Sequence, residues 1–283
     1  MGTDFDKLID QLIVFALEED LGDGDHTSLS CVPPDASGSA RLLVKQDGII
    51  AGVEMAARIL QKVDEKLKVE FFMADGKPVK YGDIVFQVSG LSQSILKAER
   101  LLLNIMQRMS GIATKTRRYV DLLKGLKTKV LDTRKTSPGM RVIEKMAVRI
   151  GGGQNHRFGL YDMILIKDNH VDFAGGIEKA IRKSKDYLLK IGKNLPVEIE
   201  VRNFNELNQV IEIGHVDRIM FDNFSVDDTR KAVHLINNRF ETESSGGINL
   251  STVRAYAECG VDYVSVGELT HQIESLDLSL KAL

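Results

Sequence analysis

From residue 129 onward, short apolar runs alternate with amphipathic helical patterns, and this alternation limits the possible folds more than any other feature. Strand-like runs, most of them apolar, occupy residues 129–131, 163–166, 197–201, 218–221, 240–243 and 263–266. Helical patterns between them include residues 177–189, 206–213, 227–237 and 250–258. Polar residues stand at the ends of the runs. Functional residues would therefore lie at the end of every strand, as in a barrel, and not only where the strand order reverses, as in a doubly wound sheet. The pattern predicts a TIM-like α/β barrel over residues 111–270.

The first 110 residues lack this alternation. They combine predicted helices at residues 6–20 and 54–63 with short predicted strands at 40–46, 48–52, 67–73 and 84–88. We therefore expect a small α+β domain over residues 1–110. A long helix at 94–124, with a weak point at Ser110-Gly111, would link the two halves. Residues 271–283 form a tail with a strand-like pattern, which we expect to pack back on the N-terminal domain.

A glycine-rich loop, Gly22 to Asp25, follows the first predicted helix. Such a loop could hold a phosphate or a metal ion if a helix began directly after it. No helix start is evident in the residues that follow. We therefore interpret the loop as a structural turn.

Residues 131–170 carry a local excess of positive charge. The segment contains seven Lys or Arg residues and only four acids, whereas the whole chain has a formal net charge of −2. A solvated basic face would spread such charges along helices, but here they cluster at the ends of apolar runs and beside a glycine triplet. The segment predicts a pocket for a small substrate with several negative charges.

Other strand ends carry acids and small residues. Glu200 and Asp222 end successive runs, so both should point into one barrel mouth. There they could bind Mg²⁺, hold sugar hydroxyls, stabilise a developing cation, or form a salt bridge with Lys167 or Arg134. The loops at 243–248 and 265–271 follow the last two strands, where barrels often bind phosphate.

Several classes of protein are disfavoured. The sequence contains no P-loop, nucleophile elbow, dinucleotide fingerprint or HExxH motif, and its two cysteines have no zinc-site spacing. A near-neutral net charge disfavours nucleic acid as the main partner. No apolar run approaches the roughly 18 residues of a membrane span, and no signal peptide is evident. We therefore expect a cytoplasmic protein.

Eight segments together resemble the quinolinate phosphoribosyltransferase family. They are EDLGDGDHTS, AERLLLNIMQRMSGIAT, LDTRKTSPGMR, EKMAVRIGGGQNHRFGLYDMILIKDNH, EIEV, FDNF, ESSGGI and SVGELTH. The match runs nearly end to end and in order, and its long central block is specific. The resemblance implies an incomplete barrel whose mouth is closed by the N-terminal domain of a second subunit, as a homodimer. It also implies phosphoribosyl transfer from phosphoribosyl pyrophosphate (PRPP) to quinolinate, with decarboxylation and with Mg²⁺ as cofactor.

The resemblance also assigns site residues. The residues it implies for quinolinate are Arg134, His156, Arg157, Lys167 and, from the neighbouring subunit, Arg100. The residues it implies for PRPP are Thr133, Lys135, Lys167, Glu200, Asp222, Ser245, Gly246, Gly247, Val266 and Gly267. Lys135, Lys167, Glu200 and Asp222 would be catalytic, and Glu200 and Asp222 would bind the metal, directly or through water. From the residues alone, His156 could equally be structural.

Two other functions compete with this hypothesis. A related barrel of the kind found with molybdate transport genes could act on a different anion. A binding protein without catalysis would keep the phosphate loops but would not need Lys135, Glu200 and Asp222. The full set of Arg100, Arg134, His156 and Arg157 favours quinolinate, because it suits two carboxylates.

Overall fold

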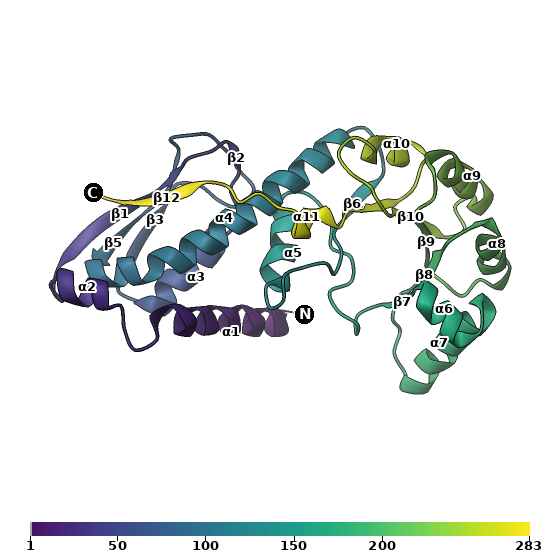
Figure 1. Cartoon of the computed structure of the whole chain (residues 1–283), viewed down its shortest axis with the longest axis horizontal. Coiled ribbons are helices and arrows are strands. Elements are labelled where there is room, and N and C mark those ends of the chain that lie inside the picture. Colours follow the sequence, from purple (N-terminus) through teal and green to yellow (C-terminus); the bar gives the residue numbers. More distant parts are fainter. Residues whose placement is uncertain (1) are drawn as a thin grey trace. The chain divides into compact units, whose positions relative to one another are not determined.

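The computed structural model describes residues 2–283 (Figure 1). The chain divides into two compact units: unit 1 comprises Met1–Arg117, Thr136–Gly152 and Leu269–Leu283, and unit 2 comprises Arg118–Lys135 and Gly153–Glu268. Residues 136–152 thus group with unit 1, although the sequence assigned them to the barrel. In unit 1, the Arg108 guanidinium lies 2.6 Å from the buried Glu144 carboxylate, and this ion pair ties the 136–152 segment to the preceding long helix.

Unit 1 is an antiparallel sheet with helices. Its strands are β1 (Ser37–Val44), β2 (Gly48–Ile49), β3 (Lys68–Phe71), β4 (Pro78–Val79), β5 (Ile84–Leu91) and β12 (Leu278–Ala282). Its helices are α1 (Gly2–Leu21), α2 (His26–Cys31), α3 (Val53–Val63), α5 (Arg141–Ile150) and the greater part of α4 (Ser92–Leu122). The main sheet has the order β12-β1-β5-β3, so the C-terminal strand pairs with β1.

The core of unit 1 follows from period-two and helical patterns. Along β1, Ala40, Leu42 and Val44 alternate with less buried residues and turn one face of the strand inward. Helix α3 buries its apolar stripe, including Ile59 and Leu60. The sheet therefore has one packed face, which is typical of antiparallel sheets.

Two features of unit 1 differ from the interpretation of the sequence. The suspected weak point at Ser110-Gly111 is continuous helix, because both residues serve close packing. The Ser110 hydroxyl bonds the backbone N–H and carbonyl of Ala51, and a Cβ on Gly111 would stand 2.2 Å from the carbonyl oxygen of Glu274. A short helix, α2, also follows the glycine loop, with the Asp25 side chain capping the N–H of Ser28 at 3.0 Å.

Unit 2 contains a six-stranded parallel sheet in the order β6-β11-β10-β9-β8-β7. The strands are β6 (Lys129–Leu131), β7 (Ile164–Ile166), β8 (Val197–Val201), β9 (Arg218–Asp222), β10 (Glu241–Ser245) and β11 (Tyr263–Ser265). Within residues 2–283, β6 and β7 are the two ends of the order and do not pair, so the sheet does not close. The predicted α/β fold, a small N-terminal domain with an open parallel barrel, is confirmed.

Helices cover the outside of this sheet. They are α6 (Asp168–Ala174), α7 (Ile177–Ile191), α8 (Phe204–Ile213), α9 (Val226–Ile236) and α10 (Val253–Glu258), and the four-residue α11 (Glu268–His271) follows β11. Figure 1 shows α7 to α10 on the outer side of the strands. Local chemistry sets their ends: the Asn203 and Ser225 side chains cap α8 and α9, and a left-handed glycine, Gly192, ends α7.

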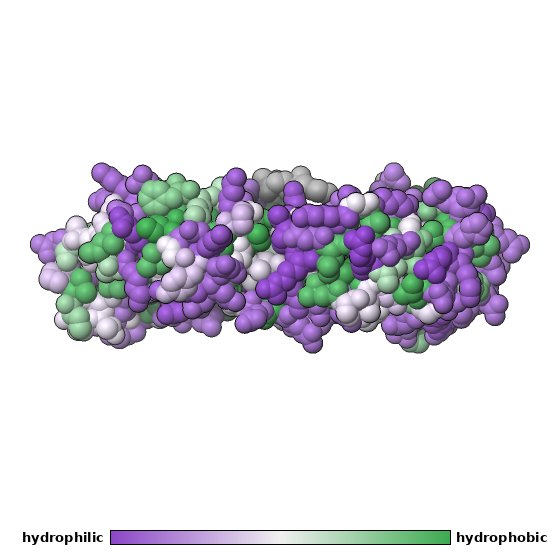
Figure 2. Space-filling view, turned by 90° about the horizontal axis from the view of Figure 1, so that it is seen from above, coloured by the Kyte–Doolittle hydropathy of each residue, from purple (hydrophilic) through white to green (hydrophobic). Residues whose placement is uncertain are grey.

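Hydrophilic and hydrophobic side chains are interspersed on the face of the molecule in Figure 2. Within residues 2–283, no helix combines the length and apolarity that crossing a membrane requires.

Candidate active site

The carboxyl ends of the parallel strands bring most of the predicted residues to one edge of unit 2. Thr133, Arg134 and Lys135 follow β6, and Lys167 follows β7. Glu200, Asp222 and Ser245 lie in the last two residues of β8, β9 and β10, and Ser245 pairs with Asp222 in register. Val266 and Gly267 follow β11. Parallel strands place such residues at the same edge of a sheet, as the alternation predicted.

Glu200 lies among opposing charges. Its carboxylate is 3.4 Å from the Nζ atom of Lys167, which is the salt bridge that the sequence left open. Burial raises the pKa of the Glu200 carboxyl above its usual value, Lys167 lowers it, and the charges of Asp222 and Asp168 raise it further. The Glu200 side chain is only 9% exposed, whereas Lys167 is half exposed. The Glu200 carboxylate is thus acted on by the charges of one lysine and two further acids.

Two arginines form the cationic part of the site. Burial lowers the pKa of the Arg157 guanidinium, and the positive charge of Arg134 lowers it further. The buried Nε atom of Arg134 has no hydrogen-bond partner within the described chain. Arg157 donates one long hydrogen bond, 3.4 Å, to the carbonyl of Met163. Two neighbouring guanidinium groups with so few internal acceptors are suited to an anion that brings several oxygens.

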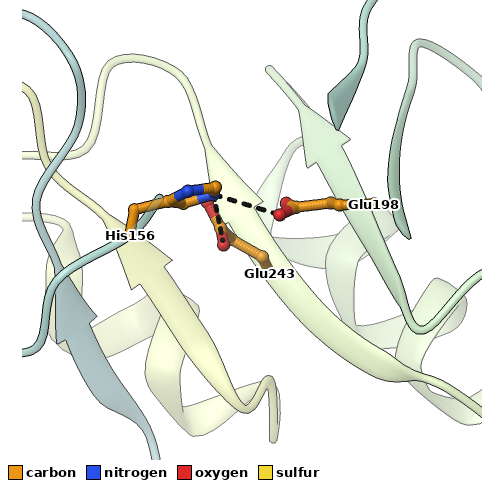
Figure 3. Close-up of side chains that lie close together, drawn as sticks. All are labelled: His156, Glu198 and Glu243. Atoms are coloured by element: carbon orange, nitrogen blue, oxygen red, sulfur yellow. Dashed lines mark ion pairs between the residues drawn. The ribbon is translucent and has the colours of Figure 1, made fainter. Parts of the chain in front are cut away.

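His156 occupies a different environment from these cations. Its ring is buried, and its Nε2 atom lies 3.0 Å from Glu198 and 3.6 Å from Glu243 (Figure 3). Both acids point into the sheet's inner space from β8 and β10. Burial raises the pKa of each carboxyl, and Glu198 adds to the rise at Glu243. Neither acid was predicted as a site residue, although each lies two residues before one, Glu200 or Ser245, and therefore on the same face of its strand.

The loop after β10 has the backbone of an anion site. Gly246 and Gly247 have φ angles of +96° and +62°, which favour glycine. A Cβ on Gly246 would lie 2.2 Å from the Oδ1 atom of Asn223. The Asn223 N–H in turn donates to the Ser245 carbonyl at 2.9 Å, so the loops after β9 and β10 support each other. Their exposed N–H groups can approach a phosphate closely.

Arg100 is the one predicted site residue outside unit 2. It is exposed on α4 in unit 1, and the strand-end residues all belong to unit 2. The structure thus brings together the residues predicted within the barrel, and the roles of all these residues stay predictions.

A parallel α/β barrel with cations, acids and glycine loops at its strand ends is typical of barrel enzymes that act on small phosphorylated anions. Two family models match the chain: "Quinolinate phosphoribosyl transferase, N-terminal domain" over residues 25–110 and "Quinolinate phosphoribosyl transferase, C-terminal domain" over residues 112–281. The chain belongs to the quinolinate phosphoribosyl transferase family.

Individual relatives agree over nearly the whole chain. A rice (Oryza sativa subsp. japonica) protein named nicotinate-nucleotide pyrophosphorylase (carboxylating), chloroplastic, is 44% identical over 95% of this chain and 76% of its own. A Bacillus subtilis protein named probable nicotinate-nucleotide pyrophosphorylase (carboxylating) is 41% identical over 93% of this chain and 89% of its own. The solved nicotinate-nucleotide pyrophosphorylase of Francisella tularensis is 40% identical, with a TM-score of 0.91 over 98% of this chain and 96% of that one.

Proposed function

We propose that the chain transfers the phosphoribosyl group of PRPP to quinolinate and removes one carboxylate, giving nicotinate mononucleotide, pyrophosphate and CO₂. This is a step of NAD biosynthesis. Family membership over both domains supports the reaction. In the geometry, the strongest support is the neighbouring pair Arg134 and Arg157, two cations with few acceptors within the described chain.

Quinolinate carries two adjacent carboxylates on a pyridine ring. Arg134, Arg157 and Lys167 offer the donors that two carboxylates need, and guanidinium groups bind carboxylates through paired hydrogen bonds. Holding the ring this way fixes its nitrogen relative to the second substrate. A fixed approach replaces a collision in solution, which can lower the barrier by several kcal/mol, up to about 7 to 11.

PRPP carries a phosphate at one end and a pyrophosphate at the other. The backbone of Ser245 to Gly247 and of Val266 to Gly267 would hold the 5′-phosphate. Thr133 and Lys135, after β6, would hold the pyrophosphate. The anomeric carbon then lies between the two ends, at Glu200 and Asp222, the acids in the last two residues of β8 and β9.

In the transfer step, the pyridine nitrogen forms a bond with the anomeric carbon as the bond to pyrophosphate breaks. Positive charge develops on the sugar, and the carboxylates of Glu200 and Asp222 are placed to stabilise it. The ring nitrogen of the product is positive. It can therefore stabilise the electron pair left at C2 when CO₂ leaves, after which C2 takes a proton. No nucleophilic side chain is needed.

The acids fit Mg²⁺, which prefers oxygen ligands and is usually held by one or two carboxylates together with substrate phosphates. Burial raises the pKa of the Glu200 carboxyl, and the negative charges of Asp222 and Asp168 add to the rise, so a divalent cation would relieve the repulsion among these acids. Glu200 and Asp222 would hold the ion, directly or through water. When bound, Mg²⁺ would neutralise charge on the departing pyrophosphate.

Arg100 would complete the quinolinate site of a neighbouring subunit in a homodimer. Its exposure on α4 supports this role, because it is available to an adjacent chain. Hybrid dimers test the idea. Arg100→Ala and Lys135→Ala homodimers should each be inactive, and mixing them should restore some activity. If no activity returns although subunit exchange is verified, each site is complete within one chain. The cytoplasmic location stays a prediction from the sequence.

The decisive assay supplies quinolinate, PRPP and Mg²⁺ and measures CO₂ and pyrophosphate. We expect both products in equal amounts, and none with nicotinate in place of quinolinate. Use of nicotinate or another acid would assign the barrel to a different substrate. Binding of PRPP without turnover of any acid would indicate the non-catalytic alternative.

A further inference from the structure

The buried group of His156, Glu198 and Glu243 has no part in the chemistry proposed above. Figure 3 shows the three side chains converging from a loop and two strands. The two carboxylates are fully buried, and the imidazole is 6% exposed. Burying three ionisable groups is unfavourable unless their contacts compensate, so their contacts reveal what the group does.

The hydrogen bonds of His156 fix its tautomer. Its Nδ1 atom accepts the backbone N–H of Arg157 at 2.7 Å. In a neutral imidazole the other nitrogen, Nε2, then carries the proton. That N–H lies 3.0 Å from Glu198 Oε2 and 3.6 Å from Glu243 Oε2, near enough for electrostatic attraction but without the alignment of a hydrogen bond. The two nitrogens of His156 are therefore turned to the protein, one to the Arg157 backbone and one to the buried acids.

A metal ion is a poor occupant for this group, although one nitrogen and two carboxylates are suitable ligands. Arg218 already supplies a cation, with its Nη1 atom 3.1 Å from Glu243 and 3.7 Å from Glu198. The charge of Arg157 acts on Glu198 as well. A divalent ion would meet two guanidinium charges at close range and be repelled by both.

The turn formed by Asn155, His156 and Arg157 is also held by Asp132. The Asp132 carboxylate accepts the His156 N–H at 2.9 Å and an Asn155 side-chain N–H at 2.6 Å. Asp132 is fully buried and stands directly after β6, two residues before Arg134. The turn that carries Arg157 is thus attached to the strand end that carries Arg134.

We infer that His156 and Glu198 are positioning residues for quinolinate: His156 holds the Arg157 backbone through its Nδ1 atom, and the charge of Glu198 attracts both the His156 Nε2–H and the Arg157 guanidinium. This inference rests on the proposed function. It replaces the predicted contact between His156 and quinolinate with an indirect effect through Arg157. A direct contact through Nδ1 would require the ring to give up the Arg157 N–H, and one through Nε2 would require it to turn away from Glu198.

Two substitutions at one position separate these roles. In His156→Asn, the amide oxygen can occupy the place of Nδ1 and accept the Arg157 N–H, but the side chain is too short to reach Glu198. In His156→Gln, the longer side chain can reach Glu198 but places no acceptor where Nδ1 stands. Positioning predicts that the Gln variant raises the KM for quinolinate about tenfold, by analogy with the smallest losses seen when the outer partners of metal ligands are removed, and the Asn variant clearly less. The KM for PRPP should change in neither.

The opposite order, with Asn more harmful than Gln, would indicate direct contact through Nε2 and overturn the inference. Equal effects of both, or equal effects on both substrates, would overturn it too. Wild-type turnover of quinolinate tests the proposed function separately, because it does not depend on these variants.

A second pair of variants tests the effect of the Glu198 charge on Arg157. It does not depend on the two His156 variants. Glu198→Gln keeps the shape of the side chain and removes its charge. Glu241→Gln is the matched control, because Glu241 also pairs with Arg218, at 3.0 Å, but is half exposed at the other end of its strand. We expect a raised KM for quinolinate in Glu198→Gln and a KM within about twofold of wild type in the control. Equal values in the two variants would refute the role of Glu198.

Discussion

Adding one methyl group at Gly246 or at Gly247 tests the phosphate loop, because the two glycines are neighbours in different surroundings. Both have positive φ angles, +96° and +62°. A Cβ at Gly246 would lie 2.2 Å from Asn223 Oδ1 and 3.0 Å from the Asn223 backbone nitrogen, whereas a Cβ at Gly247 would meet nothing within 4 Å. Gly247→Ala is therefore the control for Gly246→Ala.

The magnitudes follow from these two environments. An alanine at positive φ costs roughly 1 to 2 kcal/mol, and this term applies to both variants. At Gly246 the methyl group must also displace Asn223, and displacement of a packed backbone costs roughly a further 1 to 3 kcal/mol. Gly246→Ala should thus lower the free energy of unfolding by about 2 kcal/mol more than Gly247→Ala. Urea unfolding of both variants measures this difference.

The loop's function gives a second readout. Displacing Asn223 moves the backbone that is proposed to hold the 5′-phosphate, so Gly246→Ala should raise the KM for PRPP more than the KM for quinolinate. Equal losses of stability in the two variants would refute the packing explanation. Unchanged PRPP binding in Gly246→Ala would refute the placement of the phosphate.

Three further outcomes are expected. Arg134→Ala should weaken quinolinate binding by about 1.5 to 3 kcal/mol or more, and an unchanged affinity by calorimetry would contradict the assigned contact. Chelation of Mg²⁺ should abolish turnover and weaken PRPP binding. Glu200→Gln should lower the affinity for Mg²⁺ measured in the presence of PRPP. If the variant binds Mg²⁺ as tightly as the wild type, Glu200 does not hold the ion. Burial and the charge of Glu198 raise the pKa of Glu243 to about 7 from 4.5, so its contribution to stability is complete below pH 4.5 and is lost as the pH rises through 7. Between pH 4.5 and pH 7, the unfolding free energy of the wild type should fall by on the order of 3 kcal/mol relative to that of Glu243→Gln. A difference between the two proteins that does not change with pH would refute the raised pKa of Glu243.

Most of the barrel could be predicted from the sequence, because each strand of unit 2 is a short buried run followed by a helix with a polar start. Short elements gave weaker signals. The six residues of α2 are too few to display helical periodicity, and only its cap, Asp25 bonded to Ser28, marks it. The pairing of β2 with β4 involves two residues in each strand, and so few residues have no readable alternation.

The candidate site was predictable where its residues end strands. Lys167, Glu200 and Asp222 each interrupt or follow an apolar run, and the sheet gathers such positions at one edge. Glu198 and Glu243 were missed because they lie inside their strands, where an isolated acid suggests a solvent-facing side. Their burial depends on partners from other elements, His156 and Arg218, that no local pattern identifies.

The interior of this open barrel shows why those acids are present. A barrel interior is usually filled by branched apolar side chains, but here Glu198, Arg218 and Glu243 occupy neighbouring strands, and Arg218 also stacks on the ring of Tyr263 at 4.0 Å. Replacing a buried ionic group by apolar residues is often neutral or stabilising, so stability alone does not account for it. Apolar packing at these positions would, however, leave Arg157 without the negative charge beneath it. On the inference above, the charged interior holds Arg157 in place, which predicts that joint apolar replacement of Glu198, Arg218 and Glu243 can gain stability only with a loss of quinolinate affinity.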